Sequence, residues 1–427
     1  MDGDSGKGQR LTNRWVVLAL IVGIAILNFA DRYLLSGLVG PIKAEFALSD
    51  GFMGLLMGPA FAVIYTFAAI PIARLADRTS RISVVCFGCA VWSGFTALTA
   101  FAHSGTALAI ARIGVGIGEA AYQAPSAALI VAYFPVHQRT RALAMVGSAI
   151  YIGQMLGMAG GPMIAKDYGW RSAFELLGTV GIIVAATTWL IVREPNRDRI
   201  AAGNREPLSF LTAQFARAAS LRNMTLAMAF GTLSGVTFGL WGPALFERAY
   251  HLQNAEAGQQ FGLAFGLPGL LGVLLFGVIA DRLARRGAEW PLRLTALALF
   301  AATACVLAAT WMPTIGWARA LAVPAGLLGG GWSVGVVASL QTVLPERNRS
   351  TGTAMALLII GLFGNFIGPW SAGLLSDLAG SSTDGAQGLR LGLSIIVPTG
   401  FIGAWLAWRA SLAVEADRQR LASRALG

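Results

Sequence analysis

Residues Arg112 to Pro125, Arg-Ile-Gly-Val-Gly-Ile-Gly-Glu-Ala-Ala-Tyr-Gln-Ala-Pro, place two opposite charges inside a long apolar run. Arg112 and Glu119 are two helical turns, or about 10 Å, apart, so they share a helix face but cannot bond each other. Placing either charge at membrane depth costs about 2.5 to 3.5 kcal/mol. Each side chain therefore needs a partner on another helix, either in a functional site or in a structural ion pair.

The composition indicates an all-α membrane protein. Of 427 residues, 56% are hydrophobic and only 12% are charged, and apolar runs of about 20 residues are long enough to span a bilayer as helices. Twelve such runs occur, at Trp15 to Leu38, Phe52 to Ala73, Ile82 to Phe101, Thr106 to Tyr133, Ala142 to Ala165, Ser172 to Val192, Asn223 to Phe246, Gly258 to Ala280, Leu294 to Met312, Ala320 to Leu344, Gly352 to Leu375 and Leu389 to Trp408.

The distribution of basic residues predicts the orientation. Of the 32 Lys and Arg residues, 24 lie in the termini and even-numbered connections, 6 in the odd-numbered connections when Arg390 at the start of the last run is counted there, and 2 within spans. The positive-inside rule therefore predicts cytoplasmic termini. This scatter also argues against a nucleic-acid partner for the net charge of +11. The preference for Arg over Lys, 29 to 3, favours a GC-rich bacterium and hence an inner-membrane protein.

Two six-span bundles and three cytoplasmic segments follow from this pattern. We expect an N-terminal tail (1–14), a first bundle (15–192), a cytoplasmic linker (193–222), a second bundle (223–408) and a C-terminal tail (409–427). The linker carries Leu208, Leu211 and Phe215 on one side of a possible interfacial helix, or is simply solvated.

The first span contains a second group of polar residues. Asn28 lies three and four positions before Asp31 and Arg32, on the same helix face. These ionisable groups are natural partners for Glu119 and Arg112. The alternative is that the span ends early and leaves Asp31 and Arg32 at the outer interface, although apolar residues continue beyond them.

Short motifs recur in the two bundles. A G-x-x-x-D-R-x-x-R pattern, with Ala73 in place of the leading glycine in its first copy, recurs after 204 residues. A Pro-x-x-x-Arg pattern recurs after 210 residues, and a glycine-rich segment ending in Gly-Pro after 207. Three motifs that recur at nearly the same offset indicate an internal repeat of six spans. They lie at Ala73 to Arg81 and Gly277 to Arg285, at Tyr133 to Thr140 and Val343 to Ser350, and at Gly153 to Pro162 and Gly361 to Pro369.

The D-R-x-x-R loops and the glycine-rich fifth span resemble the signature motifs of the major facilitator superfamily over the whole chain. The resemblance implies two parallel six-helix repeats with a substrate site between them near the membrane midplane. Three segments are also similar to the spinster family of lysolipid and sphingolipid transporters. They are Asn28-Phe-Ala-Asp-Arg-Tyr33, Gly116-Ile-Gly-Glu-Ala-Ala-Tyr122 and Arg139-Thr-Arg141. Organic anion symporters share the first two patterns, but usually carry W-F-P-x-x-E-R where this chain has Tyr133-Phe-Pro-Val-His-Gln-Arg139.

We expect a proton-coupled transporter of an amphiphilic, lipid-like substrate that works by alternating access. Asp31 and Glu119 are the expected proton-coupling pair, because a change of charge partner changes a carboxylate's proton affinity. Arg32 and Arg112 are their expected partners or contact the substrate head group, since guanidinium binds phosphate and carboxylate bidentately. The expected cavity residues are Asn28, Tyr122, Thr232, Trp241, Trp332 and Asn365. The resemblance implies a cytoplasmic gate formed by Asp77, Arg78, Arg81, Arg141, Asp281, Arg282 and Arg285.

Other functions are less well supported by the residues. Drug export and small organic anion symport within the same superfamily remain alternatives. A non-transporting receptor leaves the buried charges unexplained, and an intramembrane enzyme would need a catalytic set that the sequence lacks. No metal-ligand spacing or cofactor motif occurs, so we expect neither a metal nor a cofactor. We expect the transporter to be a monomer.

Overall fold

A computed structural model of the chain describes residues 12–194, 218–344, 356, 359–380 and 385–425. Nearly all of these residues are helical. Within this part of the chain, ten helices are long and apolar enough to cross a membrane. The structure is therefore that of an all-α membrane protein, as the composition predicts.

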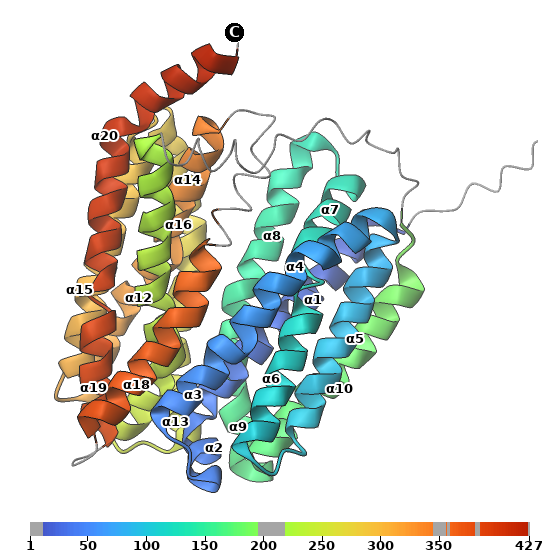
Figure 1. The fold of residues 1–427 in the computed structure, drawn as a ribbon, viewed down its shortest axis with the longest axis vertical. Helices are drawn as coiled ribbons and strands as arrows, with labels where there is room; N and C mark the ends of the chain where they lie inside the picture. Colours follow the sequence, from blue (N-terminus) through green and yellow to red (C-terminus); the bar gives the residue numbers. More distant parts are fainter. Residues whose placement is uncertain (1–11, 195–217, 345–355, 357–358, 381–384, 426–427) are drawn as a thin grey trace, which may run out of the picture.

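The first half of the chain forms one bundle, drawn from blue to green in Figure 1. Its elements are α1 (Arg14–Gly37), α2 (Val39–Phe46), α3 (Asp50–Met57), α4 (Pro59–Arg78), α5 (Arg81–Thr99), α6 (Gly105–Glu119), α7 (Gln123–Tyr133), α8 (Val136–Met155), the π-helical η1 (Leu156–Gly160), α9 (Gly161–Tyr168) and α10 (Trp170–Ile191).

The second half forms the other bundle, drawn from yellow-green to red. Its elements are α12 (Ala219–Ala249), α13 (Asn254–Phe261), the π-helical η2 (Gly262–Gly266), α14 (Leu267–Ala284), α15 (Trp290–Trp311), α16 (Ile315–Val343), the π-helical η4 (Gly361–Ile367), α18 (Gly368–Gly380), α19 (Gly385–Ile396) and α20 (Thr399–Ala425).

Two of the twelve predicted spans, the fourth and the eleventh, are not among these ten helices in the described part of the chain. The fourth is divided into α6 and α7 by a turn at residues 120–122. The eleventh begins at Gly352, and residues 352–355, 357 and 358 lie outside the described residues. The count of twelve spans therefore stays a prediction.

Three π-helical segments each end just before a helix with proline at its second position. Pro162 follows η1, Pro268 follows η2 and Pro369 follows η4. Proline has no N–H and its ring clashes with the carbonyl four residues earlier, so widening the preceding turn relieves the conflict. Two of these prolines belong to the Gly-Pro repeat recognised in the sequence, which thus marks one local geometry in both halves.

The halves meet at the end of the molecule opposite the chain termini. There α3 packs against α18, and α13 packs against η1 and α9. The contact is close because glycines line it: a Cβ on Gly54 would lie 2.5 Å from the Pro369 carbonyl oxygen, and one on Gly258 would lie 2.2 Å from that of Met158. In Figure 1 the helices of the two halves converge at this lower end, and the C-terminus lies at the upper end.

The predicted linker and tails are described only in part. Most of the linker, residues 195–217, and residues 1–11 of the N-terminal tail lie outside the described residues. The segment after the last span continues α20 as a helix to Ala425. Its Asp417 is buried and accepts hydrogen bonds from the backbone N–H and the hydroxyl of Ser220, both at 2.8 Å, which attaches this extension to the start of α12.

Glycines in η1 allow α1 to pack tightly within the first half. A Cβ on Gly157 would lie 2.5 Å from the Ala30 carbonyl oxygen and 2.8 Å from the Leu34 nitrogen. Gly160, in the same segment, has no heavy atom within 4 Å of the corresponding position. Only Gly157 is therefore required by packing, as small residues are at membrane helix contacts.

We predict that Gly157→Ala destabilises the protein by about 1 to 3 kcal/mol, because the backbone of α1 must move away from the new methyl group. The matched change Gly160→Ala should leave stability unchanged or slightly raise it, since alanine is the better helix former. Thermal unfolding of the purified variants in detergent tests both, and equal midpoints would contradict the packing argument.

Candidate functional site

Two crossed ion pairs join α1 and α6 in the first half. Arg112 Nη1 lies 3.0 Å from Asp31 Oδ2, and Arg32 Nε lies 2.7 Å from Glu119 Oε2. Asp31 and Arg32 are neighbours on α1, so each binds the opposite charge from a different turn of α6. The expectation that the charges of the first span partner those of the fourth is confirmed.

Burial divides the four charges unequally. Asp31, Arg112 and Glu119 have side chains that are at most 2% exposed, whereas that of Arg32 is 16% exposed. Buried ions keep their charge only when paired and hydrogen-bonded, because desolvation costs several kcal/mol per ion. Arg32 is thus the member of the group that reaches solvent-accessible space.

A third helix contributes to the site through Thr96 of α5. Its hydroxyl oxygen lies 2.6 Å from Asp31 Oδ1 and 2.9 Å from the Trp92 carbonyl oxygen. A hydroxyl has one proton, so Thr96 donates to only one of these acceptors at a time. Thr96 was not among the residues predicted from the sequence, although its position as a polar residue in the third apolar run could have indicated it.

Aromatic rings surround the Arg32 guanidinium. Its central carbon lies 4.5 Å from the ring centroid of Phe61, 5.0 Å from that of Tyr65 and 5.4 Å from that of Phe29. Rings at such distances attract a cation through their electron-rich faces. Arg32 is therefore held in place by contacts other than its carboxylate partner.

Several polar atoms of the site are buried and make no hydrogen bond with the described residues. They are Glu119 Oε1, Arg32 Nη2, Arg112 Nε and both amide atoms of Asn28. A buried polar atom without a partner costs about 1 to 3 kcal/mol. The site thus offers unused donors from both arginines and from Asn28 to an anionic or polar ligand.

The other predicted cavity residues make no hydrogen bond to the four charged side chains among the described residues. Tyr122 is buried at the turn between α6 and α7, with its hydroxyl 3.4 Å from the Ile21 carbonyl oxygen. Thr232 of α12 packs against Gly364 of η4, and both Thr232 and Asn365 are partly exposed. These two are the predicted polar residues of the second half that retain exposure.

Both predicted tryptophans are used in packing. Trp241 has no exposed surface, and its indole N–H donates to the Pro369 carbonyl oxygen at 2.9 Å. Trp332 is 6% exposed and packs against Gly231 of α12. Their placement argues against the ligand-binding role that the sequence suggested, because the indole surfaces already contact the protein.

The predicted gating residues lie at the end of the molecule that carries the termini. Arg78, Arg141, Asp281, Arg282 and Arg285 are exposed, and Arg81 is partly buried. Asp77 is in the last turn of α4, and its side chain lies outside the described residues. None of the six described side chains makes a salt bridge with another described residue, in contrast to the opposite end.

At the opposite end, Asp50 of α3 is bonded to the second half. Arg248 of α12 donates from both terminal nitrogens to the Asp50 carboxylate, at 2.6 and 2.8 Å. Ser376 of α18 donates at 2.7 Å and Lys43 at 2.5 Å. Asp377 accepts from the backbone N–H groups of Asp50 and Gly51 at 2.8 and 2.7 Å. We call these residues the Asp50 cluster.

The Asp50 cluster was not predicted from the sequence, because its helices extend beyond the predicted apolar runs. Arg248 and Asp377 follow the predicted seventh and eleventh runs, but α12 extends to Ala249 and α18 to Gly380. Both charged residues therefore lie at the ends of second-half helices. Asp50 directly follows Ser49, a pattern typical of a helix start, but its partner is 198 residues away.

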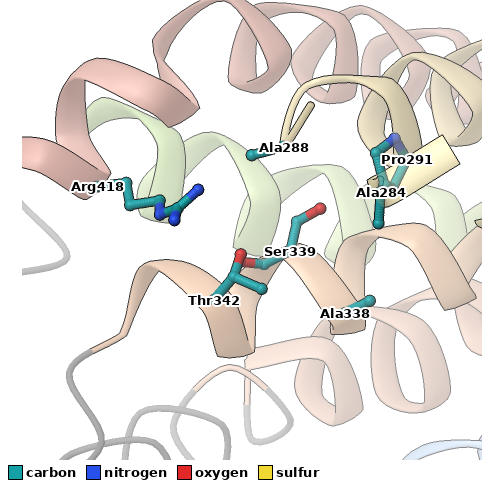
Figure 2. Close-up of a pocket in the computed structure, with 7 residues that line it drawn as sticks. All are labelled: Ala284, Ala288, Pro291, Ala338, Ser339, Thr342 and Arg418. Carbon is teal, nitrogen blue, oxygen red and sulfur yellow. The ribbon is translucent and has the colours of Figure 1, made fainter. Parts of the chain in front are cut away.

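A pocket of about 280 Å³ lies elsewhere, near the end that carries the termini (Figure 2). It is lined by residues from the ends of α14 and α16, the start of α15 and the extension of α20. Its lining residues are Ala284, Ala288, Pro291, Ala338, Ser339, Thr342 and Arg418. None of them belongs to the ion-pair site, so the two sites are distinct.

Comparisons with known proteins agree with this architecture. Residues 21–369 match the family model of the Major Facilitator Superfamily. An MFS-type efflux pump of Mycolicibacterium smegmatis is 32% identical over 98% of this chain and 97% of its own. Protein spinster homolog 1 of Xenopus laevis is 27% identical over 95% of this chain and 82% of its own.

A solved structure is also similar. It is a bacterial homologue of the human lysosomal transporter Spinster in an inward-facing, unoccupied conformation. The two chains superpose with a TM-score of 0.82 at 25% identity, over 95% of this chain and 98% of the other. The internal repeat, the two bundles and the family match agree. This chain therefore belongs to the major facilitator superfamily and is a transporter related to the spinster family.

Proposed function

We propose that the protein is a proton-coupled secondary transporter of an amphiphile with an anionic head, of lysophospholipid or sphingoid phosphate type. The observation that carries this proposal is the pair of crossed salt bridges, in which buried carboxylates hold arginines that still have unused donors. In such an arrangement, a proton that binds a carboxylate frees its arginine to bind the substrate anion.

Protonation of Glu119 would remove the charge that holds Arg32. The aromatic rings of Phe61 and Tyr65 would keep the guanidinium in place. Its freed nitrogens could then bind a phosphate or carboxylate, which guanidinium does in a bidentate manner. Loss of the substrate anion would restore the salt bridge and favour release of the proton.

Asp31 can respond in the same way through Thr96. While Asp31 is ionised it accepts from both Arg112 and Thr96. When it takes up a proton, the Thr96 hydroxyl can turn to the Trp92 carbonyl oxygen without breaking the helix. The group therefore has a second arrangement that leaves Arg112 free for the substrate.

The contrast between the halves supports an amphiphilic substrate. The ion pairs lie in the first half. The elements α12 and η4 of the second half contribute Thr232 and Asn365. They also carry Phe230 and Phe363, whose ring centroids lie 6.2 Å apart in an edge-to-face contact. A charged head would bind the first half, while an apolar tail would lie against these aromatic residues.

With the termini in the cytoplasm, as the positive-inside rule predicts, the Asp50 cluster would close the outer end and the structure would be the inward-facing state. The exposed charged residues at the other end, such as Asp281 and Arg282, are then expected to form the gate when the cytoplasmic end closes in the outward-facing state. The similar spinster homologue is described as inward-facing, which supports this assignment.

An exporter of drugs or a symporter of small organic anions is the second candidate. It is favoured by the 32% identity to a protein named as an MFS-type efflux pump. Uptake into liposomes with an imposed pH gradient distinguishes the candidates when a labelled lysolipid, a sphingoid phosphate, a soluble carboxylate and a cationic dye are compared. Transport of the carboxylate or dye alone would refute the lipid proposal.

We predict that Glu119→Gln abolishes accumulation driven by the pH gradient, because glutamine fixes the neutral state of the carboxylate. Substrate binding and downhill exchange should persist. Asp31→Asn should behave alike if both acids couple to protons. Liposome uptake with and without a gradient measures this, and unchanged accumulation in both variants would contradict proton coupling.

We predict that Arg112→Lys loses most transport although it retains the charge, since lysine lacks the bidentate fork. The variant should remain folded, which size-exclusion chromatography in detergent checks. Transport like that of the wild type by Arg112→Lys, but not by Arg112→Ala, would mean that charge alone matters.

We predict that Asp50→Asn opens the end that carries the Asp50 cluster. Breaking one partner of a buried ion pair costs about 3 to 5 kcal/mol, which destabilises only the state that contains the pair. Spin-label distances between the halves measure the shift. Glu45→Gln is the matched control, because Glu45 pairs with Arg171 at 2.7 Å within the first half. An equal response of both variants would refute the assignment.

A further inference from the structure

Two arginines of the second half lie where apolar helix segments give way to charged ones. Arg293 is in the first turn of α15, ahead of the predicted apolar run from Leu294 to Met312. Arg409 directly follows the last apolar run, within α20. The helices α15 and α20 pack against each other and lie at the edge of the molecule in Figure 1. Both arginines therefore lie at one boundary between hydrocarbon and water.

Exposed tryptophans hold these two arginines. The Arg293 guanidinium lies 4.9 Å from the ring centroid of Trp290 and 5.9 Å from that of Trp408, and that of Arg409 lies 5.3 Å from that of Trp405. The three tryptophans are 36 to 56% exposed. Tryptophan favours the level of the lipid head groups. We call these five residues the Arg–Trp patch.

Neither arginine of the patch has a carboxylate partner in the described part of the chain. Arg293 Nε is buried and makes no hydrogen bond. Arg418, further along α20, differs because it lies 3.7 Å from Glu415 and lines the pocket of Figure 2. The patch therefore presents two positive charges, fixed by aromatic contacts and not neutralised by the protein.

We propose that the Arg–Trp patch binds the phosphate of an anionic glycerophospholipid in the leaflet on the side of the termini. Guanidinium nitrogens match phosphate oxygens in charge and geometry. The indole rings would contact the glycerol and upper acyl chains of the same lipid. The patch lies wholly within the second half, so the bound lipid touches the same residues in every arrangement of the halves. It should stabilise that half without favouring either transport state.

The test uses the full chain, purified in detergent, with native mass spectrometry and thermal unfolding as readouts. Phosphatidylglycerol, phosphatidylcholine and inorganic phosphate are titrated separately. Phosphatidylglycerol should bind and stabilise best, and Arg293→Gln and Arg409→Gln should each weaken its binding about fivefold. Arg418→Gln is the matched control, with the same charge change on α20, and should bind phosphatidylglycerol like the wild type.

Several outcomes would overturn the proposal. Equal binding of phosphatidylcholine would show that the tryptophans act without charge recognition, and equal protection by inorganic phosphate would show a free-anion site. A loss of binding in Arg418→Gln as large as in the patch variants would indicate a response to net charge only. If the glutamine variants do not fold, the lysine variants Arg293→Lys and Arg409→Lys replace them. They should retain charge but lose selectivity for phosphatidylglycerol, because lysine lacks the planar fork.

Discussion

Four ionisable groups in the apolar first half, three of them buried and Arg32 partly exposed, must neutralise one another. Asp31 and Glu119 cannot be neutralised within their own helices, because the opposite charges there are adjacent or two turns away. Crossed pairing between α1 and α6 solves this problem and fixes the rotation of the two helices. The energetic balance remains sensitive, since removing one charge leaves its partner buried and unpaired. This sensitivity is what a proton can use to change the structure.

The polar contacts of the molecule fall into two classes with different consequences. The crossed pairs lie within one half, so they can change partners without separating the halves. The Asp50 cluster joins α3 to α12 and α18, so it exists only while that end is closed. A ligand or proton shifts a conformational equilibrium only through contacts that differ between the states. The first class is therefore suited to coupling, and the second to setting which end is open.

The glycines that allow close backbone contacts fall into the same two classes, within one half and between the halves. Gly157 brings η1 against α1 within the first half, whereas Gly54 and Gly258 bring the two halves together. A side chain at Gly157 would affect stability in every state. One at Gly54 or Gly258 would instead hinder closure of one end. The three π-helical segments lie beside these contacts, where proline already prevents regular helical hydrogen bonding.

Sequence by itself determined the membrane class, the twofold repeat of a six-span unit and the four charges within the apolar runs, because hydropathy and spacing are local properties. It also indicated that the charges of the first span would meet those of the fourth, since no other charges lie deep in the first-half spans. Only the tertiary structure decided that Arg112 binds Asp31 and Arg32 binds Glu119, and that Thr96, Phe61 and Tyr65 complete the site. It also placed Trp241 and Trp332 in packed contacts and revealed the Asp50 cluster. Those features depend on how helices rotate and lean against one another, which no local pattern encodes for residues up to 327 positions apart.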